Sequence, residues 1–383
     1  MLSIDAGYTT RTLQDLVRIN SVNPRLDPTA PGELAIAAYV ADALEHLGLE
    51  VFRHEPEPGR ISVVGRLRGS RPGRSLMLNA HADTVDVAGM DEPFSGDIRD
   101  GRLYGRGAYD MKGGLAAMMA AVKALAGAGR PHAGEILLAA VADEEYASLG
   151  TQDLVARYHP DGAIVTEPTA LDICLAHKGF AWFEVTTRGR AAHGSRFDLG
   201  VDANMRMGRV LAELDLLEKE LRARTPHPLV GPPSLHAATL SGGSGLSTYA
   251  ASCRLQIERR TIPGERAERV IEEIASILRR QMARDPGFEA EMTVVLVREP
   301  FEVAPDAPIV RALTEASTAV LGRRPAYLGQ TPWMDAALLS AAGAETVIMG
   351  ATGAGAHAKE EWVELASVHQ LAQCLAEAAL RYC

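Results

Sequence analysis

The chain has 383 residues and a formal net charge of −10, with 47% hydrophobic and 23% charged residues. This is the composition of a globular protein large enough for two domains. The acidic balance disfavours nucleic-acid binding, which normally needs a basic surface, and no apolar stretch is long enough to cross a bilayer.

The N-terminal segment and the cysteines indicate in which cellular compartment the protein is expected. Residues 1–15 contain no basic stretch followed by an apolar run, so no signal peptide is expected. None of the four scattered cysteines forms a C-x-x-C pair, which disfavours both a disulfide framework and a thiolate zinc site. We therefore expect a cytoplasmic protein.

The first half of the chain alternates helix and strand patterns. Residues 33–47 have the apolar spacing of an amphipathic helix that Gly48 ends, and a Gly-Gly step leads into a helix over 115–125. Short apolar strands are predicted at 61–67, 75–79, 136–142 and 163–166. Strands separated by helices predict a mostly parallel α/β sheet with both faces covered.

After His177 the order of elements changes. Strands are predicted at 181–187, 236–240, 252–257 and 292–297, with helices at 201–221 and 265–282. This β-α-β-β-α-β order is typical of a ferredoxin-like α+β domain. Because helix–strand alternation returns from Pro308, we expect a catalytic domain over 1–177 and 299–383, interrupted by an inserted domain over 178–298.

Five segments rich in histidine and acidic residues lie at the ends of predicted strands or in the loops after them. They are His81-Ala82-Asp83, Asp110, Asp143-Glu144-Glu145, Glu167 and His357. In an open α/β sheet these ends line one crevice, so distant residues can converge there. Imidazole and carboxylate without thiolate suit zinc, cobalt or manganese. Crowded carboxylates repel one another unless cations neutralise them, and two metals bridged by one carboxylate would do so.

Each segment has an ordinary interpretation when it is taken singly. An acidic residue or histidine at a strand end is more often a cap or turn residue, and residues 143–145 could be a solvated charge run. The conjunction of five such segments favours a metal site. Glycines 105, 107, 113 and 114 let the chain bend around Asp110, although the segment is not a G-x-G-x-x-G nucleotide motif, and no phosphate-binding P-loop occurs.

In this order, three of these segments and one longer C-terminal segment resemble the motifs of a known enzyme family. They are His81-Ala82-Asp83-Thr84-Val85, the segment around Asp110, Asp143-Glu144-Glu145, and His357 with Glu360-Glu361-Trp362-Val363. The family is that of the co-catalytic metallohydrolases, which includes acetylornithine deacetylase, succinyl-diaminopimelate desuccinylase, aminoacylase and glutamate carboxypeptidase. The resemblance extends from about the first helix to Trp362, and the motifs are specific in combination.

The resemblance implies a role for each motif residue. His81 and Glu167 would bind one metal ion, Glu145 and His357 would bind the other, and Asp110 would bridge them. Asp83 would orient His81 from behind, as a carboxylate beside a ligating imidazole usually does. Glu144, next to a ligand, would be the general base.

The resemblance also implies an inserted lid domain, from Lys178 to about Arg298, through which the chain forms a homodimer. His193 matches a lid histidine that reaches an active site, and Arg260 matches a lid arginine that holds a substrate carboxylate. Two segments depart from common members. No asparagine lies near 247–249, and bulky residues occupy 331–335 where many members have glycine and threonine, so the acyl group and amino acid stay open.

The expected function is hydrolysis of the amide bond of a small N-acyl amino acid with two divalent ions, zinc first and cobalt or manganese as alternatives. A dipeptidase or glutamate-type carboxypeptidase of the same family is the alternative. A dinuclear phosphoesterase would need additional cations at the crevice, and only Lys112 lies near the motifs. A non-catalytic metal-dependent binding protein is disfavoured because it has no use for a base at Glu144.

Overall fold

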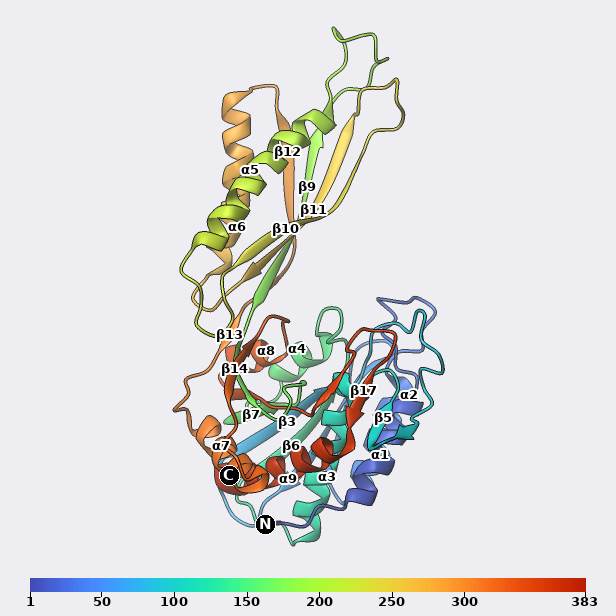
Figure 1. The fold of residues 1–383 in the computed structure, drawn as a ribbon, viewed down its shortest axis with the longest axis vertical. Helices are drawn as coiled ribbons and strands as arrows, with labels where there is room; N and C mark the ends of the chain where they lie inside the picture. Colours follow the sequence, from blue (N-terminus) through green and yellow to red (C-terminus); the bar gives the residue numbers. More distant parts are fainter. The chain divides into compact units, whose positions relative to one another are not determined.

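The computed structural model describes residues 1–383, which divide into two compact units (Figure 1). The first unit comprises Met1–Leu175, Val303–Leu328 and Met334–Cys383, and the second comprises Ala176–Glu302 and Gly329–Trp333. Each unit has its own sheet. None of the helices combines the length and apolar composition needed to cross a membrane.

The first unit is built on a mixed sheet whose central strands are parallel. Its strands follow the order β1 (Glu50–Glu57), β2 (Arg60–Arg68), β6 (Glu135–Val141), β3 (Ser75–His81), β7 (Gly162–Val165), β15 (Glu345–Ile348) and β8 (Ile173–His177). The pairs β6–β3, β3–β7 and β7–β15 are parallel, and the outer pairs are antiparallel. Strands β8, β13 (Phe301–Glu302) and β14 (Tyr327–Gln330) lie where the chain passes between units.

Helices cover both faces of this sheet. On one face are α1 (Ala6–Arg18), α3 (Gly113–Gly127), α7 (Pro308–Leu321) and α9 (Leu365–Tyr382). On the other are α2 (Leu34–His46), α4 (Leu149–Val155) and α8 (Ala336–Ala341). Helix α3 is almost entirely buried, and a Cβ at Gly114 would lie 2.5 Å from the carbonyl oxygen of Thr166. This glycine therefore lets α3 approach the end of β7, and the predicted α/β class is confirmed.

A small antiparallel sheet joins distant parts of the first unit. It has the order β16 (Gly353–Ala354), β17 (Trp362–Glu364), β5 (Arg102–Tyr104) and β4 (Ile98–Arg99). Its central pair aligns Trp362 with Tyr104, so segments more than 250 residues apart run side by side. These strands are too short for hydrophobic periodicity to reveal, and the sequence analysis missed them.

The second unit is a four-stranded antiparallel sheet with two helices on one face (Figure 1). The strand order is β10 (Ser234–Gly242), β11 (Ser252–Thr261), β9 (Gly179–Arg188) and β12 (Glu289–Arg298), and the helices are α5 (Ala203–Ala223) and α6 (Ala267–Arg284). Asp202 caps α5 by accepting from the N–H groups of Asn204 and Met205. This arrangement is the predicted ferredoxin-like α+β sandwich.

Two adjacent arginines on β11 point to opposite faces, as strand geometry requires. Arg259 is fully buried on the helix-covered side, with its Nη2 2.5 Å from Glu265 Oε1 and its Nε 3.2 Å from Glu273 Oε2. Arg259 is therefore not a solvated surface residue. Arg259 joins β11 to α6, and Arg260 alone is available to a ligand.

Replacing Arg259 with Ala should lower the free energy of unfolding by about 2 kcal/mol, because the partly buried carboxylates of Glu265 and Glu273 each lose one of their two arginine partners. Arg254 lies on the same strand but is largely exposed, and its ion pair with Glu184 should contribute less than about 1 kcal/mol. Urea denaturation of Arg259→Ala and Arg254→Ala compares the two, and equal small losses would contradict the structural role of Arg259.

Candidate metal centre

Three neighbouring parallel strands deliver most of the candidate residues. His81 is the last residue of β3, residues 143–145 follow β6, and Glu167 follows β7. Strand β3 lies between β6 and β7 and runs parallel to both. Their carboxyl ends therefore meet at one edge of the sheet, as the sequence predicted.

Asp110 arrives by a different route. It lies in an irregular turn, residues 108–112, between β5 and α3, and its peptide bond to Met111 is cis. Its two carboxylate oxygens face two different histidines: Oδ1 lies 3.1 Å from His81 Nε2 and Oδ2 lies 3.4 Å from His357 Nε2. Asp110 is thus central to the site although it follows no strand of the main sheet.

His357 lies in the loop between β16 and β17, with a left-handed backbone at φ 60°. Gly355 permits this loop, since its φ is 87° and a Cβ there would lie 1.9 Å from the carbonyl oxygen of Glu360. His357 Nε2 lies 3.1 Å from Glu145 Oε2. The imidazole is half-exposed, so this side of the cluster is open to solvent.

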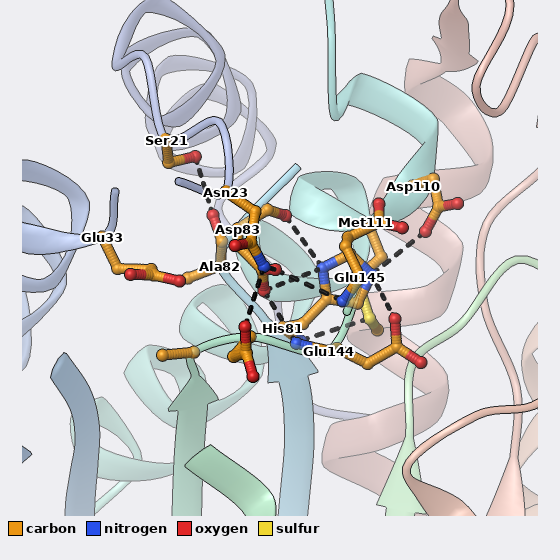
Figure 2. A network of polar contacts seen from close by, with 12 residues as sticks. Ser21, Asn23, Glu33, His81, Ala82, Asp83, Asp110, Met111, Glu144 and Glu145 are labelled. Carbon is orange, nitrogen blue, oxygen red and sulfur yellow. Dashed lines mark hydrogen bonds and ion pairs between the residues drawn. The ribbon is translucent and has the colours of Figure 1, made fainter. Parts of the chain in front are cut away.

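Two groups of side chains bring their ligand atoms within 4.8 Å of one another. One consists of His81, Glu144 and Glu167, and the other of His81, Asp110 and Glu145. His357 joins them through its contacts with Asp110 and Glu145, so all five predicted segments meet here. Figure 2 shows how His81, Asp110, Glu144 and Glu145 converge.

The carboxylates of the cluster repel one another. Burial raises the pKa of Glu144, and the charge of Glu167 raises it further. Burial and the charge of Asp110 raise the pKa values of Glu145 and Glu167. All ion pairs of these four carboxylates are with histidines, and no lysine or arginine neutralises them.

The pKa values of the two histidines are raised as well, which favours their charged form. Burial alone would lower the pKa of His81, but its hydrogen bond to Asp110 and the charge of Glu167 raise it well above the usual value. Hydrogen bonds to Asp110 and Glu145 raise the pKa of His357 to about 10. Burial would raise the pKa of Asp110, yet its two histidine partners lower it. The cluster therefore attracts positive charge.

The donor set fits divalent metal ions. It consists of imidazole nitrogens and carboxylate oxygens without thiolate, which zinc, cobalt and manganese accept. Glu145 Oε1 is buried and has no hydrogen-bond partner, although buried carboxylate oxygens are rarely left unpaired. An oxygen in this condition, beside three other carboxylates, is suited to a cation.

Asp83 lies behind His81, as expected, but its carboxylate is not the group that orients the imidazole. His81 Nδ1 donates its hydrogen to the backbone carbonyl oxygen of Asp83 at 2.9 Å, whereas the Asp83 carboxylate lies 3.8 Å away. The carboxylate instead accepts from the backbone N–H groups of Glu144 and Glu145 at 3.1 and 3.3 Å. Asp83 therefore contacts three residues of the cluster.

A buried polar network behind Asp83 was missed by the sequence analysis. The side-chain amide of Asn23 donates to Asp83 Oδ2 at 2.8 Å and to Asp143 Oδ1 at 3.1 Å (Figure 2). Arg60 donates to Asp143 at 2.8 Å and makes two hydrogen bonds to Glu33. Arg60 pairs with Asp143 and Glu33 but makes no ion pair with Asp83. The neutral side-chain amide of Asn23 is therefore what joins Asp83 to Asp143.

Lys112, the cation that the sequence suggested for the crevice, does not serve the cluster. It is fully buried, and its Nζ donates to the carbonyl oxygens of Leu16 and Ile19 at 3.0 and 2.9 Å, at the end of α1. Burial lowers the pKa of Lys112 to about 7. It therefore supplies no cationic group for a phosphoester, and the phosphoesterase alternative loses its one supporting residue.

The two remaining candidates, His193 and Arg260, belong to the second unit. His193 is exposed, and its Nδ1 lies 2.8 Å from the hydroxyl of Ser195. Arg260 donates to the carboxylate of Glu258 and to the carbonyl of Thr331, and its guanidinium lies 5.5 Å from the ring centre of Phe180. Both side chains keep donors that a ligand could use.

Comparisons with known proteins agree with this geometry. A family model described as "Peptidase family M20/M25/M40" matches residues 77–381. The chain is 31% identical to the acetylornithine deacetylase of Myxococcus xanthus over 97% of both chains. It is 28% identical to the N-formyl-4-amino-5-aminomethyl-2-methylpyrimidine deformylase of Bacillus subtilis, over 93% of this chain and 91% of that one. A solved M20 family metallo-carboxypeptidase from Sulfolobus solfataricus has the same fold, with a TM-score of 0.81, 19% identity and coverage of 98% of this chain and 99% of the other.

Replacing Asn23 with Asp should lower the free energy of unfolding by about 3 kcal/mol, because a third carboxylate would be buried against Asp83 and Asp143. The same change at Asn20 should cost less than about 0.5 kcal/mol. Its side-chain oxygen accepts from the N–H of Val22, and an aspartate can do the same.

Chemical denaturation measures both variants, and amide hydrogen exchange at Glu144 and Glu145 reports the local effect. Exchange should accelerate at these two amides in Asn23→Asp only. Unchanged protection there would remove Asn23 from the support of this turn.

Proposed function

The chain belongs to peptidase family M20/M25/M40 and is a metal-dependent hydrolase, and on this premise we propose that it removes the acyl group from a small N-acyl amino acid with two divalent ions. The observation that carries the proposal is the position of Asp110, whose two oxygens face His81 and His357 separately. One carboxylate shared between two histidines is the arrangement that a bridging ligand requires.

In this proposal His81 and Glu167 hold one ion, Glu145 and His357 hold the other, and Asp110 bridges them. The separations support this division, since His81 Nε2 lies 3.6 Å from Glu167 Oε1 and His357 Nε2 lies 3.1 Å from Glu145 Oε2. Zinc is the proposed metal, with cobalt and manganese as alternatives, because all three accept nitrogen and oxygen donors.

When bound, divalent ions at such a site make a coordinated water acidic near neutral pH and polarise a substrate carbonyl. Glu144 is the proposed general base. Its Oε2 lies 4.0 Å from His81 Nε2, beside the proposed ligands, where a carboxylate can take a proton from a bound water and then return it. Glu144 would take the proton of the attacking water and deliver it to the nitrogen of the leaving amine.

Two residues of the second unit are proposed to bind substrate. Arg260 would grip the substrate carboxylate, for which a planar guanidinium offers paired donors. His193 would donate an N–H to the oxyanion that forms at the attacked carbonyl.

The two named relatives are a deacetylase and a deformylase, which supports the removal of a small acyl group. A dipeptidase or glutamate-type carboxypeptidase is the alternative, and a panel of N-acyl amino acids against dipeptides separates the two.

A homodimer formed through the second unit is part of the proposal. Its loops 192–200 and 243–249 run side by side, linked by hydrogen bonds from Gly194 N to Ser247 O and from Tyr249 N to Ala192 O. These loops expose the large apolar side chains of Phe197, Leu199 and Leu246. Adjacent exposed apolar groups support a protein contact, and His193 lies in the same loop.

The four cysteines form no disulfide, which supports the proposed cytoplasmic location.

Glu144→Gln should retain both metal ions and lose at least ~10²-fold in kcat, because the amide cannot accept the proton. Elemental analysis of the purified variant and assays with N-acetyl amino acids measure the two quantities. Activity near that of the unaltered chain would exclude Glu144 as the base. Loss of metal together with activity would make Glu144 a ligand.

Mixing two inactive variants tests whether His193 acts across the dimer. Glu144→Ala and His193→Ala chains should each be inactive, and a co-refolded mixed dimer should recover activity, because one of its sites has an intact Glu144 and the partner's intact loop. Differently tagged chains confirm that the mixed dimer forms. If confirmed mixed dimers stay inactive, His193 acts within its own chain or not at all.

A further inference from the structure

A single buried carboxylate, that of Glu361, anchors the turn that carries Asp110. Only 1% of Glu361 is exposed. Its Oε1 accepts from the backbone N–H groups of Tyr109 and Asp110 at 2.9 and 3.0 Å. Its Oε2 accepts from the backbone N–H of Gly107 at 3.0 Å and from Arg106 Nη1 at 2.7 Å. Four donors thus converge on one side chain.

The turn needs an anchor from outside because its own residues do not fix it. Gly105 and Gly107 have φ values of 142° and 79°, which glycine adopts readily, so the sequence itself imposes little on this segment. The pairing of β17 with β5 brings Glu361 beneath the turn, and the N–H of Gly105 donates to the backbone carbonyl of Glu361. Ordering a glycine-rich turn costs conformational entropy that these hydrogen bonds offset.

Arg106 extends the anchor to the loop of the second histidine. It neutralises Glu361, and its Nη2 donates to the carbonyl oxygen of Ala358 at 3.0 Å. Ala358 directly follows His357. The Glu361–Arg106 pair therefore contacts both the turn that carries Asp110 and the loop that carries His357, and it does so with all of its charge buried.

We propose that Glu361 is a positioning residue of the metal centre, which sets the Asp110 carboxylate between the two histidines by fixing the backbone of residues 107–110. The inference rests on the proposed function, since it assumes that Asp110 binds both ions. Glu361 would bind neither metal nor substrate, yet it would control the affinity of the site for both ions.

The test compares Glu361→Gln with Glu360→Gln, the same substitution at the exposed neighbouring residue. A glutamine at 361 can still accept from two N–H groups, but its amide then faces the donors of Gly107 and Arg106. Zinc titration calorimetry of the metal-free chains should show both affinities weakened about 10- to 100-fold in Glu361→Gln, as expected for a partner behind the ligands. Glu360→Gln should match the unaltered chain.

A second readout separates positioning from general stability. Positioning predicts that zinc raises the Tm of Glu361→Gln less than that of Glu360→Gln, and that excess zinc restores most of kcat with KM unchanged. Glu361→Asp keeps the charge for Arg106 but is too short to reach all the N–H groups. It provides a folded variant with weakened affinity should Glu361→Gln fail to fold.

If either folded Glu361 variant binds zinc as tightly as Glu360→Gln, the positioning role is wrong. If its metal-free Tm falls while the zinc affinities and the zinc-induced rise in Tm stay normal, Glu361 serves stability only, and the inference is also wrong. If the unaltered chain binds no zinc, cobalt or manganese, the proposed function itself fails, and that result is distinct from both of the others.

Discussion

Four largely buried carboxylates repel one another at the centre of this fold, and the surrounding elements must hold them in place. Asp110, Glu144, Glu145 and Glu167 converge at one sheet edge with two imidazoles as their ion-pair partners. Such an arrangement is unfavourable in a folded protein unless cations bind to it. The parallel strands, the glycine-rich turn and the buried network behind Asp83 hold these groups together against their repulsion.

Much of the site could be predicted because its residues follow strands with strong apolar patterns. His81, residues 143–145 and Glu167 end β3, β6 and β7, and parallel strands bring such ends together whatever their separation in sequence. Asp110 and His357 were grouped with the others because they lie in loops after predicted strands, but they do not follow strands of the parallel core directly. A glycine-rich turn carries Asp110, and the loop between β16 and β17 carries His357, and the sequence does not show how these two loops are placed.

The missed residues share a physical reason. Asn23, Arg60 and Glu33 were not singled out, and Glu361 was named only as part of a motif. All four are polar residues whose importance comes from burial, and a sequence gives no direct sign that a polar residue is buried. The strands that deliver Glu361 are two or three residues long, too short for periodicity to appear. Arg259 illustrates the same limit, because strand alternation placed it opposite Arg260 but could not reveal two acidic partners on the helix side.

The two units are proposed to make different contributions to the reaction. The first unit contains every proposed metal ligand and the base, and the second contains His193 and Arg260. Chemistry and recognition would then vary independently, which fits a family whose named members remove different acyl groups.

Anomalous diffraction at the zinc absorption edge, from crystals grown with zinc, would locate the ions of a dinuclear centre directly. Two anomalous peaks are expected in each chain on opposite sides of the Asp110 carboxylate, one beside His81 and Glu167 and the other beside Glu145 and His357. A single peak, or peaks that Asp110 does not join, would contradict this arrangement.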